Sequence, residues 1–496
     1  MMRRSYFREL CLLACLPLPL LLRPLRAQQL SPAVAKYVKV PHAPVLVLEH
    51  VRVIDGTGAA PLENQSVVIE NGKISAISAS APAASATAVY LDLTGRTIFP
   101  GLVGMHDHMY YLTRPNQNAA GESEPPVVVP EEPFSSPRLY LGAGVTTLRT
   151  TGSVEPYMDL NLRKAIDAGK IVGPHMDVTG PYLEGPGAFA LEMHELKDAD
   201  EARRMVDYWA DQGATSFKAY MDITRAELKA AIDEAHKRGI KVTGHLCSVT
   251  YPEAVAAGID NLEHGFMVNT QLDPGKEPDL CPRTVGGPTM TKMTPDTPEA
   301  KALIALLVEH HVALTSTLPV FQSNDPAHLQ LQPRVLAAMS APTREQYLTT
   351  RNLELMRAAA DPKMAAARAQ ILHNDMAMER AFVAAGGLLM GGPDPTGDGG
   401  TLPGYGDQRE VELLVEAGFT PLEALRICTL NGAIYLGRDK EIGSIAVGKN
   451  ADLVVVSGDP SKKISDIENT EIVFKDGVGY DSQKLLESVK GRYGQY

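Results

Sequence analysis

The chain has 496 residues, enough for one large α/β barrel with a smaller unit, or for two to three ordinary domains. Hydrophobic residues make up 44% of it and charged residues 21%, which excludes a disordered or fibrous chain and is typical of a soluble globular enzyme. The formal net charge of −12 argues against a nucleic-acid partner.

The first 27 residues have the layout of a secretory signal peptide. Arg3 and Arg4 give a basic start, residues 10–22 form an apolar run, and Ala27 ends a cleavage site. The run is too short for a stable membrane span. Residues 3–8 also resemble a twin-arginine export signal. We expect residues 1–27 to be removed and the mature protein to be exported, either periplasmic or secreted.

The cysteines give no sign of a disulfide framework. Cys11 and Cys15 would leave with the signal peptide. Cys247, Cys281 and Cys428 are an odd and widely spaced set, which is neither a disulfide framework nor a zinc knuckle. We therefore expect a large hydrophobic core to stabilise the mature chain.

Both ends of the mature chain have the pattern of short β-strands separated by tight turns. Asn71-Gly72, between two runs rich in β-branched residues, is a strong hairpin signal. We expect residues 28–96 and 438–496 to form one small β-sandwich. The candidate strands are 45–48, 51–54, 67–69, 74–77, 442–445, 452–456 and 472–475.

Between these ends, residues 97–437 alternate short apolar strands with helical segments. Residues 200–211 and 225–237 show the 3.6-residue period of amphipathic helices. Eight strand–helix units predict an α/β fold, a (β/α)8 TIM-like barrel, in which functional groups lie at the C-terminal ends of the strands. The expected strands are 98–106, 145–150, 176–182, 216–220, 241–245, 261–264, 312–317 and 388–392.

A helical insertion is expected at about residues 329–381, between the seventh and eighth barrel strands. The segment is rich in Ala, Leu, Arg and Met at helical spacing. Either a lid over the mouth of the barrel or added bulk on the barrel wall fits this pattern.

His106 and His108 end the first barrel strand, with a spacing that places both imidazoles on one side of it. A lone histidine at a strand end is more often structural than a metal ligand. Here, however, His245, His264 and Asp394 end the fifth, sixth and eighth strands. All five side chains therefore belong to the same end of the predicted barrel, and this arrangement predicts a metal centre.

Further polar side chains on the barrel strands leave alternatives open. Lys218, in the fourth strand, either pairs with an acid at the barrel mouth or, its pKa lowered by burial, reacts with carbon dioxide to give a carbamate that bridges two metals. Tyr220, on the same strand face, is either a hydrogen-bond donor to a substrate carbonyl or an interior tyrosine. Arg149 meets either a substrate carboxylate or an acid at the mouth. Asp107 faces away from the metals by strand alternation and braces the barrel.

The chain resembles the amidohydrolase superfamily, in the branch near imidazolonepropionase and the prolidase-like peptidases. The resemblance covers nearly all of the mature chain. The motifs that carry it are Pro100-Gly101-Leu102 before His106-x-His108, Gly144-Val145-Thr146-Thr147, Lys218, Gly244-His245, Glu263-His264-Gly265, Asp394, and the closing segments 421–425, 443–445 and 448–455.

The resemblance implies a binuclear centre, with zinc as the metal that best suits the ligands. The His-x-His pair and Asp394 would hold the more buried ion, and His245 and His264 the more exposed one. Carbamylated Lys218 would bridge the two ions. Asp394 would act as general base and then general acid, and Tyr220 would bind the substrate carbonyl.

One motif departs from this branch. Glu184-Gly185-Pro186 resembles the Glu-Gly-Pro motif of amino-sugar-phosphate deacetylases in the same superfamily, in which the glutamate is the bridging or sole acidic ligand. Glu184 and Lys218 therefore compete for one role. We favour Lys218, because residues 217–220 match the prolidase-like branch in position along the chain and in the types of residue.

Three functions are compatible with these residues. The leading hypothesis is an exported hydrolase that cleaves an amide or peptide C–N bond in a small substrate, such as a dipeptide or an N-acyl amino acid. The alternatives are a mononuclear deacetylase or deaminase that uses Glu184, and a non-catalytic binding protein on the same fold. The expected partner is a small-molecule substrate, without nucleic acid or a membrane span, and a homo-oligomer fits as well as a monomer.

Overall fold

The computed structural model describes residues 30–80, 87–111, 118, 124–396 and 400–495. The expected signal peptide, residues 1–27, lies outside the described residues.

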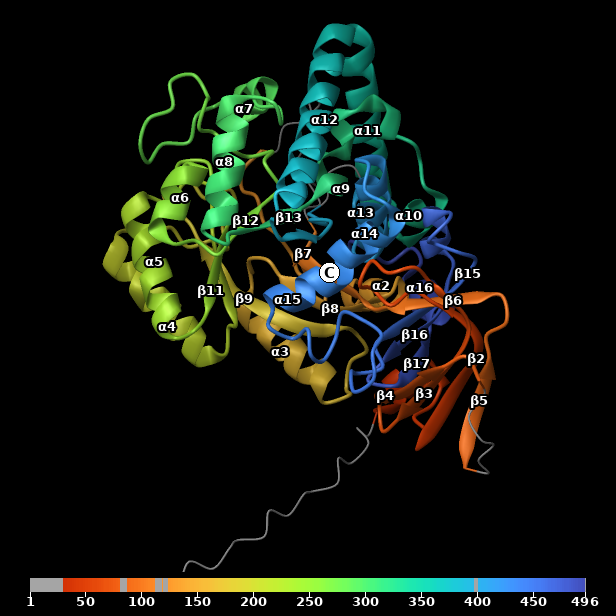
Figure 1. Ribbon diagram of the computed structural model, residues 1–496. Coiled ribbons are helices and arrows are strands. Elements are labelled where there is room, and N and C mark those ends of the chain that lie inside the picture. Colours follow the sequence, from red (N-terminus) through yellow and green to blue (C-terminus); the bar gives the residue numbers. More distant parts are fainter. Residues whose placement is uncertain (1–29, 81–86, 112–117, 119–123, 397–399, 496) are drawn as a thin grey trace, which may run out of the picture.

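Eight parallel strands form a barrel at the centre of the molecule (Figure 1). The hydrogen-bonded order runs from β7 to β14 in sequence, and the first and last strands meet where Asp394 N donates to His106 O over 3.0 Å. The (β/α)8 prediction is therefore confirmed. The strands are β7 (Leu102–Asp107), β8 (Val145–Thr150), β9 (His175–Leu183), β10 (Ser216–Ala219), β11 (Lys241–Gly244), β12 (Asn261–Glu263), β13 (Ala313–Ser316) and β14 (Leu389–Gly391).

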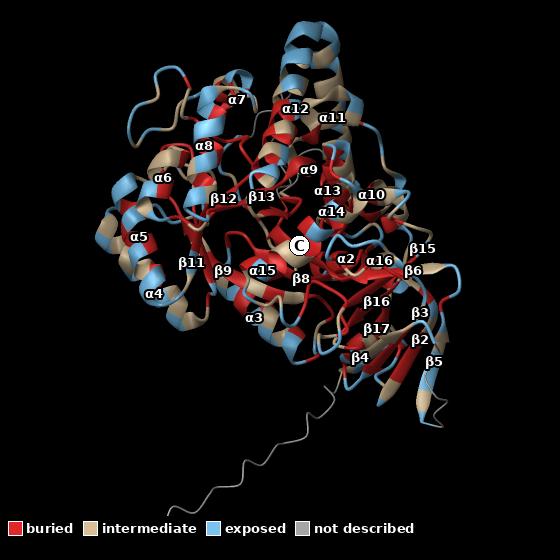
Figure 2. Ribbon diagram, viewed as in Figure 1, coloured by how far each residue is buried: buried red, intermediate tan, exposed pale blue. Residues whose placement is uncertain are grey.

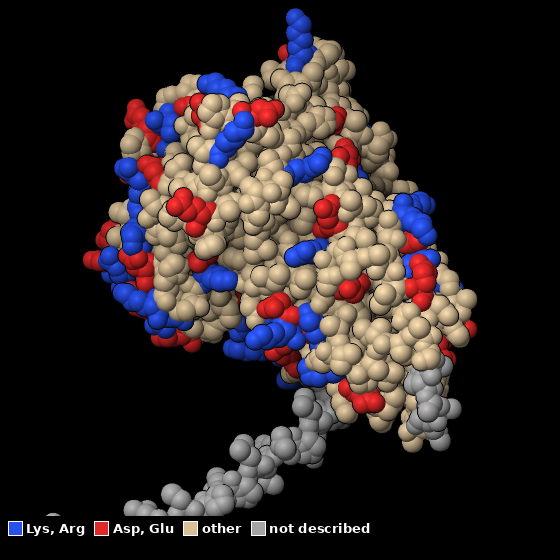
Figure 3. Space-filling view, in the orientation of Figure 1, with Lys and Arg blue, Asp and Glu red and all other residues tan. Residues whose placement is uncertain are grey.

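Amphipathic helices cover the outside of the barrel. Figure 2 shows the buried strands enclosed by helices whose outer faces are exposed. Over α4 and α5 both signs of charge alternate (Figure 3), as in the Arg238–Asp207 ion pair of 2.7 Å. The helices of this layer are α2 (Ser136–Gly142), α3 (Pro156–Asp167), α4 (Ala199–Gln212), α5 (Arg225–Lys237), α6 (Tyr251–Ala257), α7 (Gly287–Lys292), α8 (Pro298–Glu309), α13 (Tyr405–Glu416), α14 (Pro421–Arg426) and α15 (Gly432–Tyr435).

The two chain ends form the second unit, a β-sandwich whose strands belong to one nine-stranded sheet. Apolar residues from strands at both ends of this sheet share one core, so the sheet folds over on itself. The strands are β1 (Val38–Val40), β2 (Val45–Val53), β3 (Leu62–Glu70), β4 (Lys73–Ser78), β5 (Ala88–Asp92), β6 (Arg96–Pro100), β15 (Leu453–Ser457), β16 (Thr470–Lys475) and β17 (Val478–Asp481), with α1 (Pro32–Ala35) before them and α16 (Ser482–Val489) after them.

The segment 98–106, expected as one strand, is divided between the two units at Gly101. β6 pairs with β15 in the sandwich, whereas β7 pairs with β8 in the barrel. Gly101 N donates to Asp452 O on one side, and a Cβ at this position would lie 2.0 Å from Thr146 Oγ1. The glycine is needed because the chain passes between the two sheets with no room for a side chain.

The helical insertion comprises α10 (Pro333–Ala338), α11 (Ala341–Ala360) and α12 (Pro362–Ala384), preceded by the short α9 (Leu318–Phe321). The C-terminal half of α12 joins the barrel wall, where Glu379 accepts from Ser316 Oγ over 2.9 Å. The other end of the α11–α12 hairpin stands away from the barrel (Figure 1). Within the described residues, none of these helices, nor any other, has the length and apolar content of a membrane-crossing helix.

Cys247 and Cys281 form a disulfide, with 4.9 Å between their Cα atoms, so the expectation of no disulfide was wrong for this pair. It ties the loop after β11 to the loop between β12 and α7, both on the mouth side of the barrel. The odd number of cysteines after residue 27 concealed it. Among the described residues Cys428 is the free cysteine, and it is buried.

Closing a 34-residue separation stabilises a folded chain by limiting the entropy of the unfolded one. We predict that Cys281→Ser lowers the free energy of unfolding by about 3–4 kcal/mol. Denatured mature protein should show one reactive thiol per chain without reductant and three with it. Three thiols without reductant would contradict the disulfide.

A row of buried carboxyl groups lies between the barrel strands and helices α12 and α13. It contains Asp375, Glu379, Asp407 and Glu410, and it reaches Asp107 of β7, which contacts Asp407 and Tyr140 on the helical side. Burial raises the pKa of Glu410 to about 8 and the pKa of Asp407 to about 7. At neutral pH the Glu410 side chain is therefore mostly protonated in the folded chain, and that of Asp407 is protonated in about half of the molecules.

The Glu410 proton makes stability depend on pH. Its folded pKa lies above the unfolded value near 4, so this contribution to the free energy of unfolding is complete below pH about 4 and is lost as the pH rises to about 8. Glu410→Gln mimics the protonated acid. Its free energy of unfolding should rise relative to that of the wild type by about 1.4 kcal/mol for each pH unit across this window. Denaturant unfolding at several pH values measures it, and parallel curves for the two proteins would refute it.

Candidate metal centre

The six expected ligands lie together at the C-terminal ends of the barrel strands. Five of them lie within one residue of the last residue of their strands, Asp394 lies three residues beyond β14, and each is buried or nearly so. His264 and Asp394 follow their strands in the left-handed region, with φ of +68° and +50°, which turns both side chains over the barrel mouth. The six are His106, His108, Lys218, His245, His264 and Asp394.

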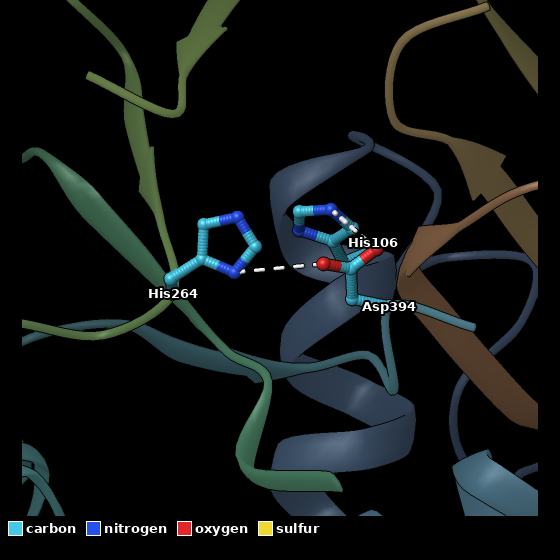
Figure 4. Close-up of side chains that lie close together, drawn as sticks. All are labelled: His106, His264 and Asp394. Atoms are coloured by element: carbon cyan, nitrogen blue, oxygen red, sulfur yellow. Dashed lines mark ion pairs between the residues drawn. The ribbon is translucent and has the colours of Figure 1, made fainter. Parts of the chain in front are cut away.

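Asp394 is the centre of the group. Its Oδ1 lies 3.2 Å from His108 Nε2. The same oxygen lies 3.6 Å from His106 Nε2, and Oδ2 lies 3.9 Å from His264 Nδ1 (Figure 4). One ligand atom from each of His106, His264 and Asp394 lies within 4.8 Å of the other two. Ligand atoms this close together suit a metal centre.

Hydrogen bonds orient the histidines from behind. His106 Nδ1 lies 2.8 Å from Glu263 Oε2 and His108 Nδ1 lies 3.2 Å from Gly152 O, so each Nδ1 donates its proton and each Nε2 keeps a lone pair. The Nε2 lone pairs point at Asp394 Oδ1, which accepts no hydrogen bond from any described residue. Imidazole lone pairs beside a buried carboxylate oxygen are an arrangement that suits a bound cation.

His264 brings His245 into the group. His264 Nε2 lies 3.0 Å from His245 Nδ1, close enough for the two nitrogens to share one ion, and Thr317 Oγ1 lies 2.8 Å from His264 Nδ1. Burial lowers the pKa of His245 to about 3, and burial together with the neighbouring cations holds the pKa of His106 and His264 well below the usual range. Neutral imidazoles are the form that binds metal.

Lys218 is 1% exposed, and its Nζ lies 3.1 Å from His106 Nε2. Burial lowers the pKa of Lys218 to about 8, although the charges of Asp394 and Glu263 act in the opposite direction. Within the described part of the chain, Lys218 makes no ion pair with an acid at the mouth. The amine therefore lies among the metal ligands, partly in its neutral and nucleophilic form.

Glu263 supports the site and was not expected from the sequence. Its Oε2 holds His106, while its Oε1 lies 2.7 Å from Arg149 Nη2 and accepts from Thr243 Oγ1. Arg149 is 1% exposed and pairs with this acid at the C-terminal end of β12, so of the two expected alternatives the pairing with an acid is confirmed. The sequence did contain a sign of the role of Glu263. Asn261 and Glu263 alternate in β12, so both side chains point into the barrel, but the neighbouring His264 drew the interpretation of this strand end.

Aromatic rings form one wall of the centre. The Tyr220 ring centroid lies 4.9 Å from that of His245 and 4.7 Å from that of Tyr182, and the hydroxyls of Tyr182 and Tyr110 are hydrogen-bonded to each other. Burial raises the pKa of Tyr220 above its ordinary value, so its hydroxyl keeps its proton and can donate it in a hydrogen bond. Tyr110 could have been found from its place two residues after His108.

The hydrogen bonds of Glu184 join it to the backbone and not to the histidines. Its Oε1 accepts the backbone N–H groups of Gly185 and Asp222, both over 2.8 Å, and burial raises its pKa to about 8. No described histidine forms a hydrogen bond or ion pair with it. These contacts fit an acid that orders the loop after β9.

The chain was compared with known proteins. The sequence model described as "Amidohydrolase family" matches residues 97–478. The chain belongs to the amidohydrolase family. An uncharacterised protein of Mycobacterium tuberculosis is 28% identical to this amidohydrolase over 262 residues, which are 50% of the chain and 56% of that protein. The chain thus spans about half the length of the curated relatives that it matches.

Solved structures share the fold of this amidohydrolase. A prolidase candidate from Bifidobacterium longum is 26% identical, with a TM-score of 0.62, over 90% of this chain and all of that one. A Xaa-Pro dipeptidase with methionine in its active site is 21% identical, with a TM-score of 0.64, over 88% of this chain and all of that one. At 21% identity the second likeness concerns the fold.

We predict that Glu263→Gln weakens metal binding by 10- to 100-fold, because His106 loses the carboxylate that fixes its tautomer. The free energy of unfolding should fall by about 3–5 kcal/mol, because the Arg149 charge is left buried and unpaired. Metal titration and denaturant unfolding measure the two effects. Glu410→Gln at the same pH is the matched control, and equal metal affinity in both variants would contradict the role of Glu263.

Proposed function

We propose that this amidohydrolase is an exported, metal-dependent hydrolase that cleaves an amide or peptide C–N bond in a small substrate such as a dipeptide or an N-acyl amino acid. The observation that carries the proposal is the convergence of neutral histidine lone pairs, Asp394 and a lysine of lowered pKa at one end of the barrel. Membership of the amidohydrolase family supports it.

The residues present fit two divalent ions, and imidazole and carboxylate ligands suit zinc. His106, His108 and Asp394 would hold one ion, and His245 and His264 the other. Bound there, the ions would polarise the substrate carbonyl and lower the pKa of the attacking water.

Lys218 would join the two ions as a carbamate. Its neutral Nζ would attack the carbon of carbon dioxide, forming an N–C bond and releasing one proton to solvent. Burial and a pKa of about 8 leave a usable fraction of the amine neutral at physiological pH. The carbamate carries one negative charge, which would balance part of the positive charge of the ions.

Asp394 and Tyr220 would act on the substrate. Asp394 lies against the histidines and so is placed to take the proton of the attacking water and to pass it to the leaving nitrogen as the C–N bond breaks. Tyr220 stays protonated and would donate a hydrogen bond to the carbonyl oxygen, where negative charge develops.

Two observations bear on substrate and location. The structures with the same fold include proteins described as a prolidase candidate and a Xaa-Pro dipeptidase, which supports dipeptides as the first substrates to test. The Cys247–Cys281 disulfide suits an oxidising compartment, which supports export. Turnover of a dipeptide and N-acyl amino acid library by zinc-loaded mature protein tests the substrate class. Inactivity on all of these substrates would favour a binding protein.

We predict that Lys218→Ala loses at least 100-fold in turnover and two ions per chain relative to the wild type, with partial rescue of both by a short-chain carboxylic acid that replaces the carbamate. Lys241→Ala, in a lysine at the opposite end of the barrel, is the matched control and should keep full activity and metal. Turnover and metal content per chain are the measurements.

Other outcomes of this experiment are equally informative. Full turnover in Lys218→Ala would refute the bridging carbamate. Retained metal in Lys218→Ala, combined with loss of metal in Glu184→Gln, would favour a mononuclear deacetylase or deaminase that uses Glu184.

A further inference from the structure

A second group of metal-ligating side chains lies at the opposite end of the barrel, where it meets the sandwich. His175 is the first residue of β9, Asp452 directly precedes β15, and Asp476 is in the turn between β16 and β17. We call these three residues the junction cluster. They come from three separate parts of the chain, and neither unit contains the cluster by itself.

The geometry of the junction cluster is that of a small-ion site. One ligand atom from each of the three residues lies within 4.8 Å of the other two, and His175 Nε2 lies 3.0 Å from Asp476 Oδ2. An imidazole and two carboxylates are a ligand set that zinc accepts. The side chains of His175 and Asp476 are 22% and 44% exposed, so an ion could enter from solvent and keep a water ligand.

The strongest sign of a ligand is an unpartnered oxygen. Asp452 is 5% exposed, its Oδ1 accepts from Asp476 N over 2.7 Å, and its Oδ2 is buried with no hydrogen-bond donor among the described residues. An unpartnered buried carboxylate oxygen is costly and calls for a cation or a proton.

The nearby lysine does not occupy this place. Lys475 is buried, and its Nζ donates to Gly173 O over 2.9 Å, across the same junction. Its charge lowers the electrostatic cost of Asp452 and Asp476 from a distance, but no hydrogen bond or ion pair joins it to either carboxylate among the described residues. Arg438 and His175 also act on Asp476, but no basic side chain forms a hydrogen bond or ion pair with Asp452 Oδ2 among the described residues.

We propose that the junction cluster binds one divalent transition-metal ion, with zinc as the reference ion, and that this ion fastens the sandwich to the N-terminal end of the barrel. The site is separate from the metal centre at the barrel mouth. Its occupancy would stabilise the chain, because the ion binds only the folded arrangement in which the three segments meet.

Metal counting by difference tests the proposal. Full-length mature wild type and variants are stripped with a chelator, reloaded with Zn²⁺, desalted and analysed for zinc per chain. His175→Gln, Asp452→Asn and Asp476→Asn should each hold one ion fewer than the wild type. Asp167→Asn, which removes an exposed carboxylate that acts on Lys475 from a distance, is the matched control and should hold the same number as the wild type.

A second readout reports the stabilising role. Adding Zn²⁺ to the stripped protein should raise the Tm of Asp167→Asn more than the Tm of Asp476→Asn. Asp476→Asn is used for this comparison because its carboxylate is partly exposed, so the test stands even if Asp452→Asn fails to fold. The same loss of one ion should appear when Asp476→Asn is added to Lys218→Ala, so the result is independent of the centre at the mouth. Equal zinc content in wild type, His175→Gln and Asp476→Asn would overturn the proposal.

Discussion

Burial sets the chemistry of the barrel mouth. A lysine and four histidines are buried close together, and their charged forms are disfavoured there. As a result, nitrogen lone pairs face the unpartnered Oδ1 of Asp394. In water this arrangement would relax by protonation. In the barrel it persists because the strand ends fix the side chains, and bound cations would balance it.

The framework behind the ligands explains why they do not move apart. Glu263 holds His106 on one side and Arg149 on the other, so a buried ion pair orients a ligand. The Asp394 N–H closes the seam between β14 and β7 and fixes the aspartate in its left-handed conformation. One strand contact therefore both closes the barrel and positions the residue that would move protons.

Much of this could be predicted from the sequence, and the failures have physical causes. Strand ends were located by the 3.6- and 2-residue periods, and this placed His106, Lys218 and Asp394 on one side of the barrel. The division of 98–106 was missed because β6 and β7 are both apolar and only Gly101 marks the crossing. The Cys247–Cys281 pair and the choice of Glu263 as the acid that pairs with Arg149 were missed because they depend on loops and strands brought together by the fold.

In the proposed centre, carbamylated Lys218 would bridge two metals between the histidine pairs. Anomalous diffraction from crystals of zinc-loaded protein, collected on both sides of the zinc absorption edge, tests it most directly. The account predicts two peaks roughly 3.5–4 Å apart beside Asp394, with branched density extending Lys218 Nζ between them. A single peak with an unmodified lysine would contradict it.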